Sequence, residues 1–260
     1  MSKVNETYKL KNNQLHILML IYKFRFITIP LLTTYQNLKN ETTMLRTLRI
    51  LEEKGYIYRK YEPSYKIDRK PAIYWLTAKG VAVFKDDPRF NPSILHSYYK
   101  NKHLSDEFIG HNIDTFTVYN SIRDSYKGQF EMFTKQEIAH FTDFPDNKPD
   151  IYLRGEKEYF IVLAHDMQSF LLKKRLLEYI NHSEEEGWSS GNYPTLLFVL
   201  NSNNSESRFL DFAKNSIDSA GITSIELPIA TTTIKAISQT INTPDIWTFV
   251  GEDVIPRSLA

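Results

Sequence analysis

Apolar residues recur at helical spacing in the first third of the chain. The spacing predicts helices over residues 13–24, 29–37 and 41–55. Thr28 can cap the second helix, and Pro30 near its start costs no hydrogen bond. The turn 38–40 ends on Asn40, a good N-cap for the third helix, and Gly55 stands where a helix C-cap is expected.

The third predicted helix has two chemically different faces. One face is apolar and is expected to be buried; it consists of Met44, Leu45, Leu48 and Leu51. The polar residues lie largely off that face; they are Thr42, Thr43, Arg46, Thr47 and Arg49. The helix therefore presents hydroxyl and guanidinium groups to whatever meets its outer side.

A change to β-forming residues follows the third helix. Residues 56–77 begin and end with aromatic and β-branched residues, and between them lies the basic, proline-containing stretch 61–71. This pattern predicts a hairpin with a long charged tip, closed by a helix over residues 77–85. The order of three helices and a hairpin resembles the winged helix domains that bind DNA, which implies an α+β domain over residues 1–85.

The rest of the chain alternates predicted strands and helices. Residues 86–103 contain two prolines and little periodicity, and we expect a linker there. Helices are expected over residues 104–126, 169–185 and 205–221, and strands over 130–138, 149–155, 158–166, 195–201 and 223–230. Strands that alternate with helices predict a mostly parallel α/β sheet in a second domain over residues 104–260.

The charges divide between the two parts of the chain. Residues 1–85 hold 16 Lys and Arg against 6 Asp and Glu, whereas residues 86–260 hold 16 against 25. A basic module joined to an acidic one is expected when only the first meets a polyanion. The sequence has no cysteine, a polar start and only short apolar runs, so we expect a cytoplasmic protein without a membrane span.

The predicted winged helix assigns roles to its polar residues. Side chains near the start of the third helix would reach base edges, and Arg46 is the best reader of a guanine edge. The turn and the wing would contact phosphates or the neighbouring minor groove. The predicted DNA-binding residues are Lys39, Asn40, Thr42, Thr43, Arg46, Thr47, Arg49, Arg59, Lys60, Tyr65, Lys66, Arg69 and Lys70.

The second part has the element order of the restriction-endonuclease-like superfamily. Its nucleases hold a divalent metal with the carboxylates of a PD…(D/E)xK pattern. Pro149 and Asp150 match the first element and Asp166 is present, but position 164 is Ala and position 168 is Gln. The seven histidines show no zinc-binding spacing. We therefore predict a catalytically inactive domain with no metal and no cofactor.

Taken together, the chain resembles the plasmid replication-relaxation family, grouped with MobC-type relaxosome components. The resemblance rests on the segments PDIYL, EYFIVLAHD and LLKKRLLEYI after a winged helix, and its outline is matched by Asp150, Asp166, Lys174 and Tyr179. It implies binding of double-stranded DNA near an origin of transfer or replication, in support of a relaxase or replication protein.

The sequence favours a non-enzymatic, sequence-specific DNA-binding protein that acts as a homodimer, because two-fold dimers commonly read palindromic sites. Two alternatives remain open at this point. One is a metal-dependent DNA nuclease, and the other is a transcription regulator whose C-terminal domain senses a ligand or dimerises.

Overall fold

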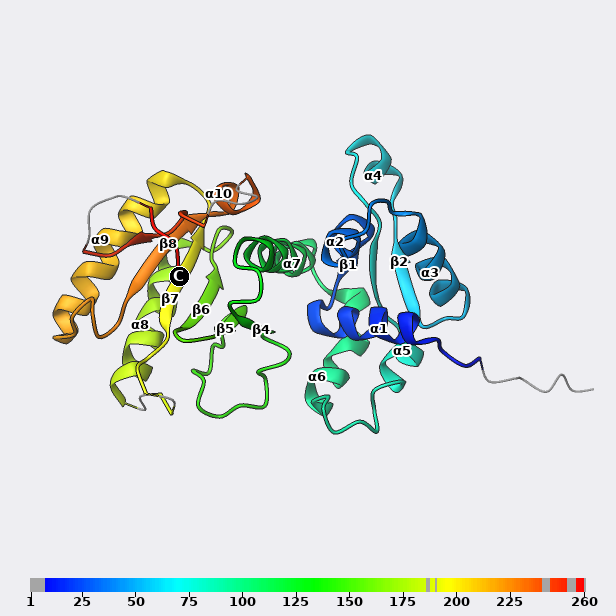
Figure 1. The fold of residues 1–260 in the computed structure, drawn as a ribbon, viewed down its shortest axis with the longest axis horizontal. Coiled ribbons are helices and arrows are strands. Elements are labelled where there is room, and N and C mark those ends of the chain that lie inside the picture. The colour runs from blue at the N-terminus through cyan, green and yellow to red at the C-terminus, as the bar shows by residue number, and fades with distance from the viewer. Residues whose placement is uncertain (1–7, 186–187, 190, 240–243, 252–255, 260) are drawn as a thin grey trace, which may run out of the picture. The chain divides into compact units, whose positions relative to one another are not determined.

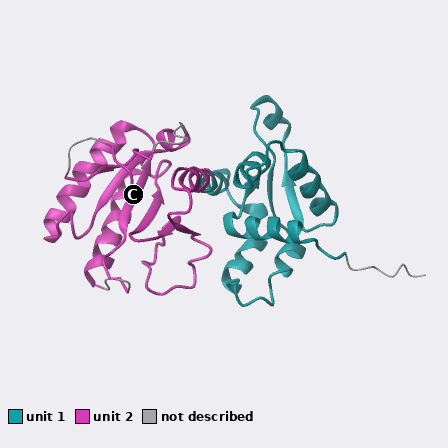
Figure 2. Ribbon diagram, in the orientation of Figure 1, with its two compact units in different colours: residues 1–116 teal, residues 117–260 magenta. Residues whose placement is uncertain are grey.

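The structure is a computed structural model that describes residues 8–185, 188–189, 191–239, 244–251 and 256–259 (Figure 1). The chain forms two compact units, residues 1–116 and residues 117–260 (Figure 2). Residues 1–7, part of the polar start on which the predicted localisation partly rests, lie outside the described residues. None of the described helices combines the length and the apolar character that crossing a membrane requires.

Unit 1 is an α+β unit in which helices surround a small sheet (Figure 1). Its elements are, in chain order, α1 (Asn12–Phe24), β1 (Ile27–Thr28), α2 (Ile29–Tyr35), α3 (Thr42–Glu53), β2 (Ile57–Lys60), α4 (Pro63–Ile67), β3 (Ile73–Leu76), α5 (Ala78–Ala82), α6 (Pro92–Ser97), the 3-10 helix η1 (Tyr98–His103) and the first part of α7 (Asp106–Ser125). The three predicted N-terminal helices are thus confirmed.

Local capping chemistry sets the ends of α2 and α3. The Thr28 side chain accepts a hydrogen bond from the Leu31 backbone N–H, as predicted. The Asn40 side chain accepts from the Thr42 backbone N–H at 3.2 Å, but the N-cap residue is Glu41, so Asn40 forms a turn just before the helix rather than its cap. Gly55 follows the C-terminus of α3 with a φ of +75°, a left-handed conformation that glycine adopts without steric cost.

The predicted hairpin is confirmed by the antiparallel pairing of β2 with β3. The short strand β1 adds to β3, which gives the sheet order β1-β3-β2. The tip contains one feature that the pattern did not predict, the five-residue helix α4, which begins at Pro63. The rings of Tyr61 and Tyr65 meet edge to face at a centroid distance of 6.0 Å within this tip.

The segment 86–103 differs from the linker that we predicted, because α6 and η1 pack within unit 1. Tyr98 is only 2% exposed, and its ring stacks on Tyr22 while its hydroxyl donates a hydrogen bond to the Tyr22 carbonyl oxygen. The Arg25 guanidinium donates hydrogen bonds to the Asn101 side chain and the Ser97 carbonyl oxygen. Helices of six residues are too short to show a hydrophobic period, so no periodic signal predicted them.

Unit 2 is built on a six-stranded mixed sheet with the strand order β4-β5-β6-β7-β8-β9. Its elements after α7 are β4 (Glu131–Thr134), β5 (Ile151–Arg154), β6 (Glu158–Leu163), α8 (Ser169–Glu185), β7 (Thr195–Leu200), α9 (Asn203–Ala220), β8 (Ile229–Thr233), α10 (Ile234–Gln239) and β9 (Thr248–Phe249). The middle strands β6 and β7 are buried along most or all of their length, as a central strand requires.

Two predictions about this sheet were wrong. Only the β6-β7 and β7-β8 pairs, which α8 and α9 connect, are parallel; the other three pairs are antiparallel, so the sheet is not mostly parallel. The strand expected over residues 223–230 is β8 instead, which starts at Ile229. The Glu226 carboxylate accepts hydrogen bonds from the backbone and side chain of Thr223, and this turn keeps the segment before Pro228 out of the sheet.

Candidate nucleic-acid interface

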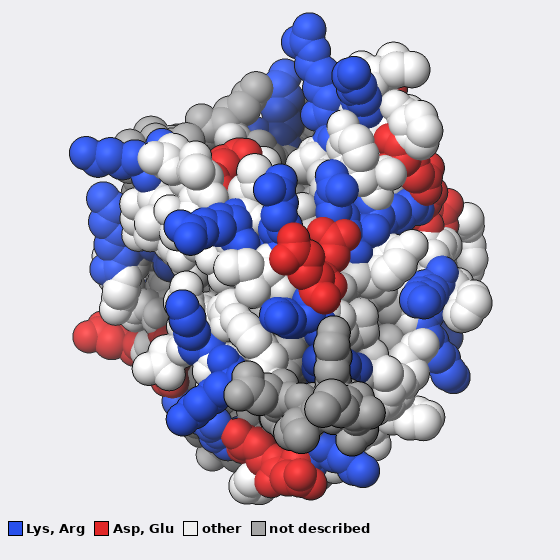
Figure 3. Space-filling view, turned by 90° about the vertical axis from the view of Figure 1, so that its right-hand side faces the viewer, with Lys and Arg blue, Asp and Glu red and all other residues white. Residues whose placement is uncertain are grey.

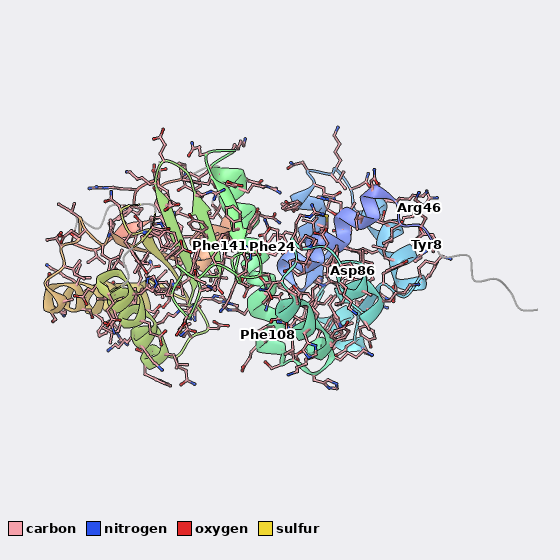
Figure 4. All side chains as sticks on the ribbon, turned by 90° about the horizontal axis from the view of Figure 1, so that it is seen from below. Tyr8, Phe24, Arg46, Asp86, Phe108 and Phe141 are labelled. Carbon is pink, nitrogen blue, oxygen red and sulfur yellow. The ribbon has the colours of Figure 1, made fainter. Side chains whose placement is uncertain are left out.

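The outer side of α3 carries an exposed stripe that consists of Thr42, Leu45, Arg46 and Arg49. Arg46 lies at the outer edge of unit 1 (Figure 4). Arg46 and Arg49 form no ion pair with any residue that the structure describes, so both guanidinium groups are available to a ligand. Thr43 is exposed beside the stripe, and Lys39 and Asn40 are exposed in the turn before the helix.

Two positions of α3 differ from the prediction. Thr47, a predicted DNA contact, is buried, and Leu45, a predicted core residue, is exposed. Thr47 is 6% exposed and its hydroxyl donates a hydrogen bond to the Thr43 carbonyl oxygen at 3.0 Å, whereas Leu45 is 43% exposed. At about 100° per residue, Thr47 lies closer than Leu45 to the centre of the face formed by Met44, Leu48 and Leu51. The angular positions of the residues on the helix therefore predict that Thr47 is buried and Leu45 exposed, whereas residue polarity predicts the opposite.

The β2–β3 hairpin adds a second group of cations, and α3 packs against β2. We call them the hairpin cations; they are Arg59, Lys66, Arg69 and Lys70, and all are exposed. Lys70 pairs with Asp68 at 3.2 Å, and the Arg59 guanidinium lies 5.0 Å from the centre of the Tyr61 ring. On the face seen in Figure 3, Lys and Arg side chains cover more of the surface than Asp and Glu do.

Lys60 differs from the hairpin cations because its charge already has partners. Its Nζ lies 2.8 Å from an Asp106 carboxylate oxygen and 3.2 Å from a Glu62 oxygen. The hydrogen bond to Asp106 raises the pKa of Lys60, so the ammonium stays charged but is held within unit 1. Lys60 is therefore less available to a nucleic acid than Lys66 is.

One cation of this region lay outside the predicted set. The Lys102 ammonium in η1 lies 5.3 Å from the centre of the Tyr58 ring on β2, so the helical segment 98–103 brings a further positive charge to the hairpin. The predicted contact residue Tyr65 is half-buried in α4, against Tyr61. The position of Lys102 beside the hairpin follows from the tertiary packing of η1 and not from the local sequence.

In unit 2, the PD motif places Asp150 immediately before β5. Asp150 is 8% exposed, and its Oδ2 accepts a hydrogen bond from the Leu163 backbone N–H at 2.8 Å. Its own backbone N–H donates to the Ile161 carbonyl oxygen at 2.9 Å. The carboxylate thus joins the start of β5 to the end of β6.

The remaining positions of a nuclease motif do not form a metal site. Ala164 is buried where a second acid would stand, and Asp166 is exposed beyond the end of β6. No group of three His, Asp or Glu side chains that could hold a metal ion occurs in the part of the chain that the structure describes.

A family model described as Replication-relaxation matches residues 18–178. The chain belongs to the replication-relaxation family. Membership indicates a role in plasmid replication or mobilisation. The match begins within α1 and ends within α8, so it includes α3, the hairpin and Asp150. No curated protein sequence matches the chain.

In this replication-relaxation protein, the charge of Asp150 acts on Lys135, the residue that follows β4. Desolvation lowers the pKa of Lys135 although part of that side chain reaches solvent, and the charge of Asp150 opposes the shift while Arg175 adds to it. Arg175 donates a hydrogen bond to the Lys148 carbonyl oxygen at 2.7 Å. Lys135 thus interacts with the charge of Asp150, and Arg175 bonds to the backbone two residues before Asp150.

The resemblance pointed to Lys174 and Tyr179 as well. The fully buried Tyr179 donates a hydrogen bond to the Asn147 carbonyl oxygen at 3.0 Å, and burial raises the pKa of its hydroxyl. Lys174 is exposed and lies 3.9 Å from Glu178 on the same helix. Tyr179 stabilises the segment that leads to Asp150, whereas Lys174 belongs to the outer face of α8.

Proposed function

We propose that the protein binds double-stranded DNA sequence-specifically through a winged helix-turn-helix fold in unit 1. The site would lie at a plasmid or conjugative-element origin, where the protein assists a relaxase or a replication protein. One observation carries the proposal: the outer stripe of α3 presents two arginines without an ion-pair partner among the described residues, next to the hairpin cations.

The order of elements supports a winged helix. The turn 36–41 joins α2 to α3, and the β2–β3 hairpin follows directly. In helix-turn-helix proteins the second helix of the pair enters the major groove, where side chains near its start reach base edges. In α3 these are Thr42 and Arg46, and an arginine can donate two hydrogen bonds to a guanine edge.

The hairpin would act as the wing. Its cations lie on β2 and on the long tip, where contacts with phosphates would fix the register of the protein on the duplex without reading sequence. Each phosphate that a lysine or arginine neutralises releases condensed counterions, so this part of the affinity depends on salt. Base reading by α3 and phosphate contact by the wing are thus separable by experiment.

Unit 2 would be a catalytically inactive, nuclease-like domain that mediates dimerisation or contacts the protein partner. The order α7, β4, β5, β6, α8, β7 is the core order expected for the restriction-endonuclease-like superfamily. The Asp150 carboxylate accepts a hydrogen bond from a backbone N–H and interacts with the charge of Lys135, which supports a structural role. The acidic composition of unit 2 also suits contact with a protein partner better than contact with the negatively charged DNA backbone.

The test begins with fragments of plasmid and genomic DNA recovered by the purified full-length protein. Fluorescence anisotropy titrations of the recovered DNA then measure the affinity of wild type, of Arg46→Ala and of Arg208→Ala. Arg208, on α9, is the matched control. We expect Arg46→Ala to weaken specific binding by ~1–3 kcal/mol and to leave binding of random duplex nearly unchanged. Arg208→Ala should bind as wild type does.

The proposal fails if the full-length chain shows no salt-sensitive affinity for any duplex. Equal losses on specific and random DNA for Arg46→Ala would remove its base-reading role. Recovery of the promoter of its own operon, without an origin, would favour a transcription regulator instead.

A further inference from the structure

Unit 2 contains a pocket of about 530 Å³ at the carboxyl ends of two neighbouring parallel strands. Two of its lining residues are buried at those ends, Ala164 directly after β6 and Leu200 at the end of β7. We call it the strand-end pocket. In open α/β sheets, ligands commonly bind outside the carboxyl ends of the strands, and pockets of about 300–1,000 Å³ hold small molecules. Both the place and the size of this pocket therefore suit a small ligand.

Helices α8 and α9 form two sides of the strand-end pocket, and they lie side by side in unit 2 (Figure 1). Leu172 of α8 and Phe209 of α9 line the pocket and are buried in the same hydrophobic core. The next lining residue on α8 is Lys173, and the residue before Phe209 on α9 is Arg208. Because their neighbours are anchored in the core, the two cations stand on fixed backbone, one on each helix.

The positive charge of this lining is not compensated within the part of the chain that the structure describes. Lys173 and Arg208 have no ion-pair partner there, and the Lys173 Nζ lies 4.7 Å from the centre of the Phe212 ring, a contact that leaves it charged. None of the described lining residues is Asp or Glu. Glu206, the acid nearest to Arg208 in the chain, accepts a hydrogen bond from the Thr231 hydroxyl.

Amide donors and a third cation extend the lining. The Asn201 and Asn204 side chains line the strand-end pocket and form no hydrogen bond with any residue that the structure describes. A second hollow of about 340 Å³ shares both asparagines and adds Lys235, which is exposed and also has no ion-pair partner among the described residues. Ammonium, guanidinium and amide groups all donate hydrogen bonds, and the oxygens of a phosphate group accept them.

We propose that the strand-end pocket binds the phosphate group of a small molecule such as a nucleotide. Lys173 and Arg208 would hold the phosphate, and the buried apolar lining would contact the rest of the ligand. Residues 117–260 hold 20 Asp and Glu against 13 Lys and Arg, so the unit as a whole repels a duplex, whereas a compact anion meets only the local cations. The inference adds a ligand site to unit 2 and does not depend on DNA binding by unit 1.

The test uses the full-length protein and isothermal titration calorimetry with AMP. Adenosine, which has the same base and sugar without the phosphate, is the ligand control, and inorganic phosphate tests the anion alone. We expect saturable binding of AMP and of inorganic phosphate, and binding of adenosine weaker by about tenfold or more. Lys173→Gln and Arg208→Ala should each weaken AMP about three- to thirtyfold, because each removes a charge-assisted hydrogen bond.

Lys214→Gln is the matched control variant, because Lys214 is exposed on α9 outside both hollows. It should bind AMP as wild type does. No saturation by AMP or inorganic phosphate in the millimolar range overturns the proposal, and so does adenosine binding as tightly as AMP. An effect of Lys173→Gln no larger than that of Lys214→Gln, in proteins with unchanged melting temperatures, also overturns it.

Duplex binding measured on the same samples separates this site from the one proposed for unit 1. Arg46→Ala should lose specific DNA affinity and keep AMP affinity, whereas Arg208→Ala should show the reverse. Equal losses of AMP and duplex affinity in Arg208→Ala would assign the pocket to the DNA backbone and overturn its assignment to a small molecule.

Discussion

The charged residues of α3 in unit 1 and of the PD motif in unit 2 differ in whether they already have partners within the protein. In unit 1, Arg46 and Arg49 extend from α3 without an ion-pair partner among the described residues. In unit 2, Asp150 is buried, accepts a hydrogen bond from Leu163 and faces Lys135. Both sites were suggested by residue type and spacing. The comparison teaches that a motif supports a binding role only where its side chains are not already satisfied within the protein.

The largest effect expected from this comparison is that of Arg46→Ala with Arg49→Ala. Both arginines lie on the exposed stripe, so their joint loss should weaken specific binding by about 2–6 kcal/mol if each contributes like a base-reading arginine. Anisotropy on the recovered site, with thermal melts to show that unit 1 stays folded, measures it. A loss below tenfold would place the interface elsewhere.

Asp150→Ala should act on stability rather than on chemistry. It leaves the buried Leu163 N–H without its acceptor, which is expected to cost about 1–3 kcal/mol in the free energy of unfolding. Urea denaturation measures this cost, and DNA affinity should remain that of wild type. Cleavage of plasmid DNA by wild type with Mg²⁺ or Mn²⁺ that disappears in Asp150→Ala would break the comparison and restore the nuclease alternative.

Lys66→Ala and Lys60→Ala sharpen the same contrast within one hairpin. Lys66 is exposed, so its loss should weaken all duplexes alike and reduce the slope of log affinity against log salt by about 1. Lys60 is held by Asp106 and Glu62, and its loss should change the slope less. Titrations at several salt concentrations on specific and random DNA distinguish the two. Equal slopes for both variants would show that the ion pairs of Lys60 open on binding.

The smallest effect is expected for Thr47→Val. Because Thr47 is buried, the exchange should alter specific affinity less than about twofold and change mainly the stability of unit 1, by about 0.5–1.5 kcal/mol for one lost hydrogen bond. Thr42→Val, at an exposed position of α3, is the comparison. A larger loss of affinity for Thr47→Val than for Thr42→Val would return Thr47 to the interface.

Much of the fold followed from local pattern. Period and capping chemistry predicted α1, α2, α3 and the long helices α7 and α8, because these signals act over a few residues. The hairpin of unit 1 and the β5–β6 turn also followed from short-range pattern. The packing of the segment 86–103 did not follow from local pattern, because it depends on the contact of Tyr98 with Tyr22, 76 residues earlier in the chain.

The candidate sites were predicted less completely than the elements that carry them. The types of the residues predicted Arg46, Arg49 and the hairpin cations as DNA contacts, and all of these are exposed. It also named Thr47 and Lys60, whose partners lie within unit 1. The rotation of a helix about its axis and the approach of Asp106 depend on packing across the unit, which no short window of sequence contains.

The amino-acid sequence by itself determined the longer helices, the hairpin, the division of charge and the outline of the replication-relaxation family, because propensity, capping and composition are properties of nearby residues. Tertiary structure alone decided that Asp150 bonds to Leu163 and that the Tyr98 ring stacks on Tyr22. Both depend on strand register and on segments brought together from far apart in the chain. Long-range packing fixes that geometry, and it also decides which polar groups remain free to bind a partner.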